Sequence, residues 1–565
     1  MLTEHLPILH VLIPLVGAIV VLAGGVLCPV RQGAWGLTFL VVLASGGCAT
    51  LLVPPVLEQG RVSYALGNWA PPYGIEYAVD SLSLLLILLI TGLASLITLY
   101  TKRSIQRDIA PNLHPYFYSA YLLFLGGLLG MVTTADLFNL YVFLEIASLA
   151  GYALIAVGRR REALLASYNY LIIGTIASTI FLLGVGYLYM ITGTLNMPDL
   201  RLRLAELYGS RTLLVGMAFI TLGLSVKMAL FPLHTWLPNA YTYAPDAVTA
   251  LMASLTTKVG VYTTFRVFFG VLKPSFLSQV VPLEEIFMFL GASAIIAGSL
   301  MAIFQQNLKR MLAYSSVAQI GYMVLGLAML NIPGMMGGVI HIVNHAVIKA
   351  GLFLAVGNLI YRTGAEQIEE LNQVARRMPL TMVAFTLCAL ALIGVPLTAG
   401  FVTKWYLILG SIEAGRWFIV PVVVVGALLA AVYLWRVIER AYFYKESVKP
   451  HPQPRSASRE EVNEYLTPPA PLSASREGES IPHPQPLSAG REGANEYLTP
   501  PAPLSAGREG ANEYLTPPTP LSASREGESI PHSQPLAAGR EGESISHPQP
   551  LAAGREGGVE PPTSP

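Results

Sequence analysis

Long apolar runs dominate the chain between residues 5 and 443. A helix needs roughly 20 predominantly apolar residues to cross the hydrocarbon core of a membrane. Runs of about that length recur with short polar breaks between them, which predicts an all-α protein that crosses the membrane many times. The pattern predicts thirteen visible spans, at residues 5–28, 34–57, 79–100, 116–133, 136–158, 165–192, 212–238, 246–270, 283–304, 311–330, 335–361, 380–410 and 416–443.

Two of these spans contain helix-breaking residues inside an otherwise apolar run. The breaks are Pro232 and Pro238 in the seventh span and Gly394, Pro396 and Gly400 in the twelfth. Such breaks are tolerated at membrane depth where the backbone faces protein or a water-filled cavity. A pair of broken helices in two halves of a chain points to an inverted repeat around an ion path. At either position a simple helix kink is the alternative.

Composition supports a membrane protein and narrows its chemistry. Hydrophobic residues make up 53% of the chain and charged residues only 12%, whereas soluble domains carry about a quarter charged residues. The net charge of +1 gives no bulk attraction to nucleic acid. The three cysteines are scattered through apolar runs without metal-ligand spacing, so no metal or cluster site is expected from them. The first apolar run lacks a basic segment before it and is interpreted as a retained span.

Positive charges in the short loops predict the orientation, because cytoplasmic loops carry an excess of Lys and Arg. With the N-terminus outside, the inside loops hold fifteen Lys and Arg residues and the outside loops hold six. We therefore expect an inner-membrane protein with its N-terminus outside and its C-terminal tail in the cytoplasm.

The composition changes abruptly at about residue 446. A short unit recurs six times beyond that point, as PLSASREG, PLSAGREG or PLAAGREG, in steps of 15 or 17 residues. Each unit has one Leu, too few apolar positions to build a core. The chain is thus expected to comprise a transmembrane domain at 1–445 and a disordered Pro/Ser/Gly-rich tail at 446–565. The tail is either a translated DNA repeat or a flexible segment that binds a partner.

Several ionisable residues fall within the apolar spans, at similar depths along their helices. A charged side chain at membrane depth is costly and therefore usually functional. At 1.5 Å rise per residue, these residues lie in or near the middle third of the bilayer. The candidates are Glu145, Lys227, Lys258, His341, His345, Lys349 and Lys404, with His234 beside the first break either a relay member or a polar cap.

The spacing of His341, His345 and Lys349 places them on one helical face. No Asp or Glu accompanies the two histidines, and the nearby lysine opposes a cation, so no metal is expected. A proton relay fits better, since His titrates near neutral pH and burial favours the neutral form of Lys. Glu145 is either the counter-charge that lets Lys227 be buried or one half of a switch with it, and the two roles are compatible.

Five separated segments resemble one known family, in the same order along the chain. They are DLFNLYVFLEIASLAGYALIA (136–156), KMALFPLHTWLPNAY (227–241), KRMLAYSSVAQIGYM (309–323), HIVNHAVIKAGLF (341–353) and PLTAGFVTKW (396–405). The family is the antiporter-like proton-translocating subunits of respiratory complex I, membrane-bound hydrogenases and Mrp-type multisubunit cation/proton antiporters. The segment around Glu145 most resembles the Mrp D-type subunit.

The resemblance implies a fourteen-helix fold with two inverted five-helix repeats. It implies that Glu145 and Lys227 form a coupled ion pair, and that Lys258, His341 and His345 form a central relay leading to Lys404. It implies partners in the form of other membrane subunits, with protons and either Na⁺ or K⁺ as the ions. This sequence departs from the family where the fourteenth helix should be, because the repeat tail begins there.

Two other functions are weaker. A redox enzyme would need a cofactor motif, and the sequence has neither a G-x-G-x-x-G after a strand nor a cysteine cluster. We therefore expect no cofactor, and any NADH dehydrogenase (quinone) activity would belong to the whole complex. A stand-alone transporter of an organic solute would need a polar substrate pocket, which the sequence does not reveal. The antiporter and complex I-like or hydrogenase settings both remain open.

Overall fold

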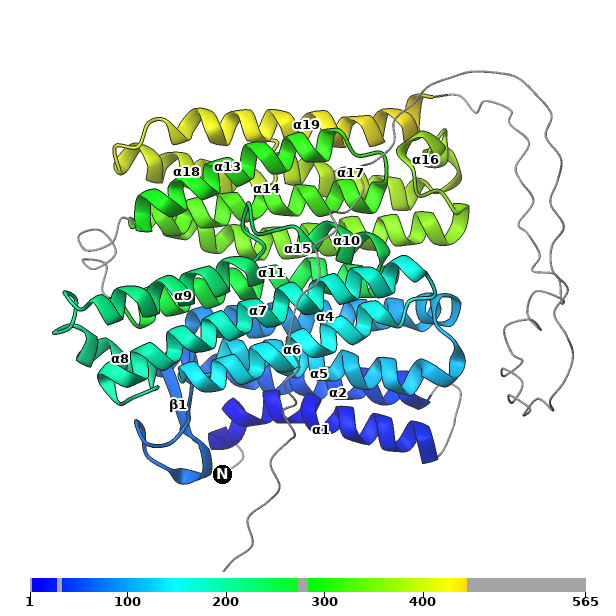
Figure 1. The fold of residues 1–565 in the computed structure, drawn as a ribbon. Helices are drawn as coiled ribbons and strands as arrows, with labels where there is room; N and C mark the ends of the chain where they lie inside the picture. The colour runs from blue at the N-terminus through cyan, green and yellow to red at the C-terminus, as the bar shows by residue number, and fades with distance from the viewer. Residues whose placement is uncertain (1–2, 28–32, 273–282, 445–565) are drawn as a thin grey trace, which may run out of the picture. The chain divides into compact units, whose positions relative to one another are not determined.

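The structure is a computed structural model that describes residues 3–27, 33–272 and 283–444. The repeat tail and the position expected for a fourteenth helix lie outside the described residues. Long helices dominate the described part of the chain and pack side by side (Figure 1). Ten of them are long and apolar enough to span a membrane. The predicted helical, many-spanning fold is therefore confirmed, while the count of thirteen spans stays a prediction.

The N-terminal part contains helices α1 (Leu6–Leu27), α2 (Gly33–Leu51), α3 (Val53–Gln59) and α4 (Ser81–Asp108). An antiparallel hairpin of β1 (Arg61–Ala65) and β2 (Glu76–Asp80) lies between α3 and α4, with Arg61 opposite Asp80. The hairpin was not predicted, because its strands are short and lack a long apolar pattern. Glu76 joins the two strands by accepting hydrogen bonds from Arg61 and Ser63, and it ties the hairpin to the start of α8 (Met197–Leu204) by accepting one from Asn196.

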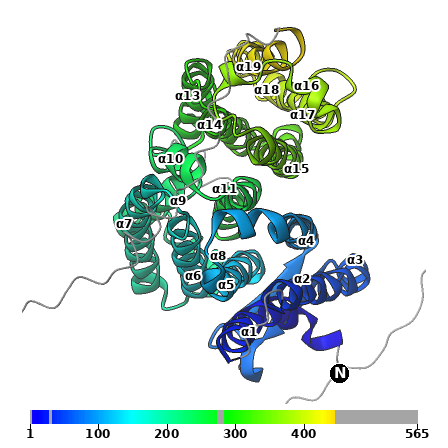
Figure 2. The ribbon, with the colours of Figure 1, turned by 90° about the vertical axis from the view of Figure 1, so that its right-hand side faces the viewer.

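Two successive groups of helices follow, and Figure 2 shows them as neighbouring clusters. The first comprises α5 (His114–Thr133), α6 (Leu137–Ala156), α7 (Arg161–Thr192), α8 (Met197–Leu204), α9 (Arg211–Lys227), α10 (Trp236–Tyr243) and α11 (Asp246–Gly270). The second comprises α13 (Leu283–Ile303), α14 (Leu308–Ala328), α15 (Ile332–Thr363), α16 (Val374–Arg377), α17 (Pro379–Ile393), α18 (Ala399–Glu413) and α19 (Ile419–Phe443). Short 3₁₀ turns occupy Thr3–His5, Leu66–Asn68, Pro111–Leu113 and Ile368–Glu370.

The two groups repeat the same local design. An isolated backbone bridge joins Asp136 to Asn196, and a second bridge joins Asn307 to Gln367. Each residue of the second bridge lies 171 residues after its counterpart in the first. Each bridge encloses one 32-residue helix, α7 or α15. Both helices end at a glycine with positive φ, Gly193 (68°) or Gly364 (73°), a conformation that favours glycine. In each group the bridge joins the residue before α6 or α14 to a residue shortly after α7 or α15. The recurrence of this arrangement supports the predicted internal repeat.

Polar caps explain where several helices begin. The side chains of Asp80, Asp136, Asn307 and Asn331 each accept a hydrogen bond from a backbone N–H in the first turn of the following helix. Such bonds satisfy donors that the helix itself leaves free. The caps set the entry points of α4, α6, α14 and α15, the last three of which carry or contact the candidate site.

Candidate functional site

Glu145 and Lys227 lie together, as an ion pair between α6 and the last residue of α9. The Lys227 Nζ is 3.7 Å from the Glu145 Oε1 and donates a shorter hydrogen bond of 2.9 Å to the Ser148 hydroxyl. The Glu145 Oε1 is buried and makes no hydrogen bond of its own. The lysine is thus held mainly by Ser148, one turn along from Glu145, and the carboxylate contact is loose.

The seventh predicted span is interrupted directly after Lys227. Helix α9 ends there, a turn follows, and α10 begins at Trp236. Pro232 lies within the interruption, whereas Pro238 lies in the first turn of α10. The Trp236 Nε1 donates to the carbonyl oxygen of Val226 at 3.0 Å, which satisfies one carbonyl near the broken end. The tryptophan ring therefore ties the two halves of the broken helix together.

His234 lies in this interruption and is mostly buried. Its ring stacks on Phe231, with centroids 5.4 Å apart, and contacts Tyr314 edge-on at 6.2 Å. Its Nδ1 is buried and makes no hydrogen bond. The position next to α14 fits both roles expected from the sequence, a relay member and a polar cap.

Lys258 lies in α11 and is almost completely enclosed by protein. Its Nζ donates to the carbonyl oxygen of Ala253 and, at 3.4 Å, to the hydroxyl of Thr257. No carboxylate in the described part of the chain lies within ion-pair distance of it. Gly260, two residues further on, packs against Met228, the neighbour of Lys227. Helix α11 thus connects the broken end of α9 with the second group of helices.

The predicted face of α15 points into the protein interior and packs towards α11, α14 and α18. The rings of His341 and His345 lie parallel, with centroids 5.8 Å apart, and both are buried. Both ring nitrogens of His345 are buried without a hydrogen bond. The Lys349 Nζ donates to the Leu312 carbonyl oxygen at 2.7 Å and to the Ser315 hydroxyl at 2.5 Å. Lys258 faces His345 and Lys349 across the α11–α15 interface.

Lys404 lies in α18, just beyond the second interruption. Helix α17 ends at Ile393, Gly394 has a φ of 84°, and α18 begins at Ala399. Pro396 lies within the interruption and Gly400 in the first turn of α18. The Lys404 Nζ donates to the carbonyl oxygens of Ile393 and, at 3.2 Å, Leu392. The break therefore supplies the acceptors that hold this buried lysine.

The structure thus brings the candidate residues, apart from His234, into two neighbouring clusters. One is the Glu145–Lys227 pair, and the other is the buried file Lys258, His345, Lys349, His341 and Lys404. Acceptors within the file are carbonyl oxygens and hydroxyls, so the described residues provide cations without carboxylate partners there. No group of three His, Cys, Asp or Glu side chains that could hold a metal occurs among the described residues.

Sequence reasoning missed the neutral side chains that hold the Glu145–Lys227 pair and the file. Ser148, Ser315 and Thr257 accept from lysines, and Gln319 and Thr403 contact the two ring nitrogens of His341 at 3.0 Å each. A single polar residue in an apolar helix is a weak signal, because Ser and Thr commonly bond their own helix backbone. The position of Ser148 one turn after Glu145 was the only available clue.

A separate polar cavity of about 440 Å³ lies at one end of the helices, near the starts of α11 and α14 and the end of α15. Within it the Lys309 Nζ contacts Asp246 at 3.1 Å and the Ala244 carbonyl oxygen at 2.6 Å. Arg160 pairs with Glu366 across it. The hydrogen bond from Arg160 lowers the pKa of Glu366, against the opposing effect of burial. Lys309 and Arg160 thus have carboxylate partners, unlike the lysines of the file.

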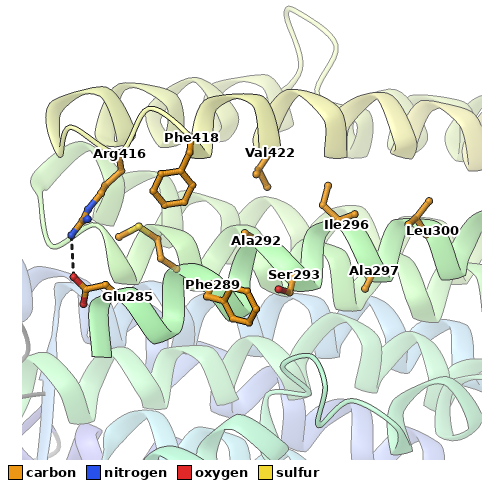
Figure 3. Close-up of a pocket in the computed structure, with 11 residues that line it drawn as sticks. Glu285, Phe289, Ala292, Ser293, Ile296, Ala297, Leu300, Arg416, Phe418 and Val422 are labelled. Carbon is orange, nitrogen blue, oxygen red and sulfur yellow. Dashed lines mark hydrogen bonds and ion pairs between the residues drawn. The ribbon is translucent and has the colours of Figure 1, made fainter. Parts of the chain in front are cut away.

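A groove of about 620 Å³ between α13 and α19 has a different character (Figure 3). Its walls are apolar apart from Ser293 and one end, where Arg416 pairs with Glu285 at 3.2 Å. None of the candidate ionisable residues lines it. The groove therefore plays no part in the site.

Comparison with known proteins places the chain in a family. Residues 134–430, which contain every candidate ionisable residue, match the family model described as NADH:quinone oxidoreductase/Mrp antiporter, TM. The chain belongs to this family. It is 46% identical to NADH-quinone oxidoreductase subunit N of Desulforudis audaxviator, over 82% of this chain and 90% of that protein. It is 30% identical to the D subunit of the Na(+)/H(+) antiporter of Bacillus subtilis, over 80% of this chain and 89% of that protein.

Comparison with solved structures leads to the same NADH:quinone oxidoreductase/Mrp antiporter family as the sequence relatives. A chain of the Mrp complex from Dietzia sp. DQ12-45-1b superposes with a TM-score of 0.72 and 28% sequence identity. The alignment covers 79% of this chain and 81% of that one. The protein is therefore a multi-pass membrane subunit of the complex I and Mrp type.

Proposed function

We propose that this protein translocates protons through its buried file of Lys and His residues. The observation that carries the proposal is the arrangement of Lys258, which is enclosed by protein and held only by neutral acceptors among the described residues. A lysine side chain in such a place is costly when it is protonated, so its neutral amine form is accessible. A group that can exist in both states can pass a proton on.

The Glu145–Lys227 pair supplies the switch in this proposal. At 3.7 Å the carboxylate still stabilises the ammonium, yet it makes no hydrogen bond with it. A movement of the Glu145 side chain would change that distance without breaking a hydrogen bond between the two, while the Ser148 hydroxyl keeps Lys227 in place. When the carboxylate moves away, Lys227 loses its opposite charge and releases its proton towards Lys258. The proton then passes along α15 to Lys404.

The proposed setting is a multisubunit monovalent cation/proton antiporter, with this chain in the place of the D-type component. The partners would be other membrane subunits, and the exchanged ions would be protons and Na⁺ or K⁺. The antiporter relative from Bacillus subtilis and the Mrp complex support this setting. The 46% identity to a subunit N favours a second candidate, a proton-pumping subunit of a complex I-like NADH:quinone oxidoreductase. Any oxidoreductase activity would then belong to the complex.

We further propose an inner-membrane location with the N-terminus outside. The excess of Lys and Arg in one set of loops supports this orientation. The polar cavity, which contains Arg107, Arg159, Arg160 and Lys309, would then open on the cytoplasmic side. The proposed transmembrane domain is 1–445, and the proposed disordered tail is 446–565.

Replacement of Glu145 by Gln tests the proposal. The amide keeps the shape of the carboxylate and removes the charge that acts on Lys227, so proton-coupled transport should be abolished. Glu145→Asp should retain part of the activity, because the charge survives with a shorter reach. The measurement is dissipation of a pH gradient in inverted membrane vesicles that carry the complete assembly, at matched protein levels.

Glu58→Gln is the matched control, since Glu58 is an exposed residue of α3. This variant should transport like the wild type. Near-normal transport by Glu145→Gln, with normal protein levels, would refute the switch. The two settings are separated by identifying the subunits that co-purify with the chain. Transport that depends on Na⁺ or K⁺ indicates the antiporter, and NADH oxidation by the purified assembly indicates the complex I-like oxidoreductase.

A further inference from the structure

The two ring nitrogens of His341 are engaged by side chains from two other helices. Its Nδ1 lies 3.0 Å from the Thr403 hydroxyl of α18, and its Nε2 lies 3.0 Å from the Gln319 Oε1 of α14. The Thr403 hydroxyl donates its own hydrogen to the Gly400 carbonyl oxygen at 2.8 Å. A hydroxyl has one hydrogen to donate, so Thr403 can only accept from His341. The Nδ1 of His341 therefore carries a hydrogen.

The partner of Nε2 then depends on the charge of the ring. An imidazolium carries a hydrogen on both nitrogens, whereas the neutral ring that keeps its Nδ1 hydrogen accepts at Nε2. The Gln319 side chain presents its carbonyl oxygen to Nε2, an arrangement that suits the imidazolium. Rotation of the terminal amide by half a turn would present the NH₂ group, which suits the neutral ring. A glutamine can thus serve both states from one position.

We propose that Gln319 is a positioning residue that keeps His341 hydrogen-bonded in both of its charge states by turning its amide. This inference rests on the proposed proton translocation and adds the residue that allows one relay histidine to gain and lose a proton. Thr403 fixes the Nδ1 hydrogen, so the hydrogen that His341 gains and loses is the one on Nε2. In this proposal the Lys258 ammonium supplies that proton and becomes neutral, and a neutral Lys404 amine takes it up, while Gln319 only turns its amide.

The charged surroundings of His341 make this role necessary. Among the residues that the structure describes, the charged groups that act on the ring are Lys404 on α18 and Lys258 on α11, both cations. His345 on the same helix and Tyr322 on α14 are its ring neighbours, 5.8 Å and 5.7 Å away. An imidazolium therefore gains nothing from a nearby carboxylate. The Gln319 carbonyl and the Thr403 hydroxyl are the acceptors that stabilise it.

The environment of Gln319 allows its amide to turn. The Tyr433 hydroxyl of α19 faces Gln319 and Ser315 but makes no hydrogen bond of good geometry with either. A hydroxyl can donate to the amide carbonyl or accept from the amide NH₂, so Tyr433 is suited to either orientation. Ser315 in turn accepts from Lys349.

Two substitutions of Gln319 test the proposal, because they should move the pH dependence of transport in opposite directions. Gln319→Glu keeps the size of the side chain but offers only acceptors, so it should retain the imidazolium to higher pH. Gln319→Leu offers no acceptor and should restrict the imidazolium to lower pH. We expect the pH optimum to rise by about one unit or more in the first variant and to fall in the second, since a hydrogen-bonded charge shifts a titration by that order.

The assay is the rate of pH-gradient dissipation from pH 5.5 to 9 in vesicles that carry the complete assembly. Gln305→Glu is the matched control, since the Gln305 side chain bonds only the Met301 carbonyl oxygen among its described contacts. Its profile should match the wild type. If Gln319→Leu is poorly produced, the comparison rests on Gln319→Glu, which preserves the shape of the site.

The outcomes separate this inference from the proposed function. Activity that falls equally at every pH, with an unshifted optimum in Gln319→Glu, would overturn the role of Gln319 and leave it a packing residue. His341→Ala is measured in parallel. If His341→Ala abolishes transport while Gln319→Glu leaves the profile unchanged, only the inference fails. If His341→Ala transports normally, the relay through this histidine fails as well.

Discussion

Replacement of Lys258 by arginine asks whether this residue must give up its proton in each transport cycle. Arginine keeps the positive charge and much of the length of the side chain, but it does not readily deprotonate. A purely structural charge should therefore tolerate the change. A relay residue should not, and Lys258→Arg should be nearly as inactive as Lys258→Ala.

The surroundings of Lys258 set the expected size of the effect. Desolvation of a buried ammonium costs several kcal/mol, and hydrogen bonds from a charged group return about 1.5–3 kcal/mol each. Lys258 has two such bonds, to Ala253 and Thr257, so its charged and neutral forms lie within a few kcal/mol of each other. In the same site an arginine is neutral roughly 10²- to 10³-fold less often than a lysine, because its guanidinium holds the proton more tightly. Transport through the neutral form should therefore fall by at least about a hundredfold.

The measurement compares pH-gradient formation and dissipation in inverted vesicles at matched protein levels. Lys102→Arg is the control for the same chemical change, since Lys102 lies near the end of α4 over the ring of Trp35. That variant should behave like the wild type. A transport rate for Lys258→Arg above about a tenth of the wild-type rate would refute the reasoning and leave Lys258 a structural charge.

Three further predictions concern the acceptor of Lys227, the contact between Asp80 and Arg266, and the tail. Ser148→Ala removes the 2.9 Å acceptor of Lys227 and should slow transport by about tenfold or more, since such a bond is worth about 1.5–3 kcal/mol; unchanged rates in the vesicle assay would contradict this. Burial raises the pKa of Asp80, but its two contacts with Arg266 and the Ser83 bonds outweigh burial and lower it to about 2. The stabilisation is therefore present above the ordinary value of 3.8 and is lost as the pH falls towards 2. Arg266→Lys loses the two-pronged contact, so the pKa of Asp80 should lie nearer its ordinary value and less stabilisation remains to be lost in acid. Heating of the detergent-solubilised assembly should therefore show a lower stability than the wild type at pH 6 but a smaller further loss between pH 6 and 3, and a loss equal to that of the wild type would argue against it. Deletion of the chain beyond about residue 450 should leave assembly and transport unchanged, and a transport defect at normal protein levels would show that the tail binds a partner.

Much of the helical framework could be predicted from apolar run length alone, and the reason is physical. A membrane forces each spanning segment to satisfy its own backbone hydrogen bonds, so a run of about 20 apolar residues has few alternatives to a helix. Helices α6, α7 and α13 accordingly fall within a few residues of the predicted spans. The hairpin at Arg61–Ala65 and Glu76–Asp80 escaped prediction, because its pairing depends on contacts to distant residues such as Asn196.

Helix boundaries near the breaks show a similar limit. Pro232 and Pro238 both marked the interruption of the seventh span, but Pro238 lies inside α10. Proline is tolerated in the first turn of a helix, where its missing N–H has no intrahelical partner. A sequence shows that a helix is disturbed near a proline, whereas only the folded chain shows on which side of that proline the helix resumes.

The sequence by itself determined that this is a many-spanning helical protein with Glu, Lys and His residues inside its apolar segments. Those properties follow from local composition and from the high cost of an ionisable group in an apolar segment. The tertiary structure decided which neutral group faces each ionisable one: Ser148 at Lys227, Ser315 at Lys349, and the broken end of α17 at Lys404. These partners are 11 to 79 residues away along the chain. Helix packing alone brings them together, and the balance between charged and neutral forms depends on such contacts.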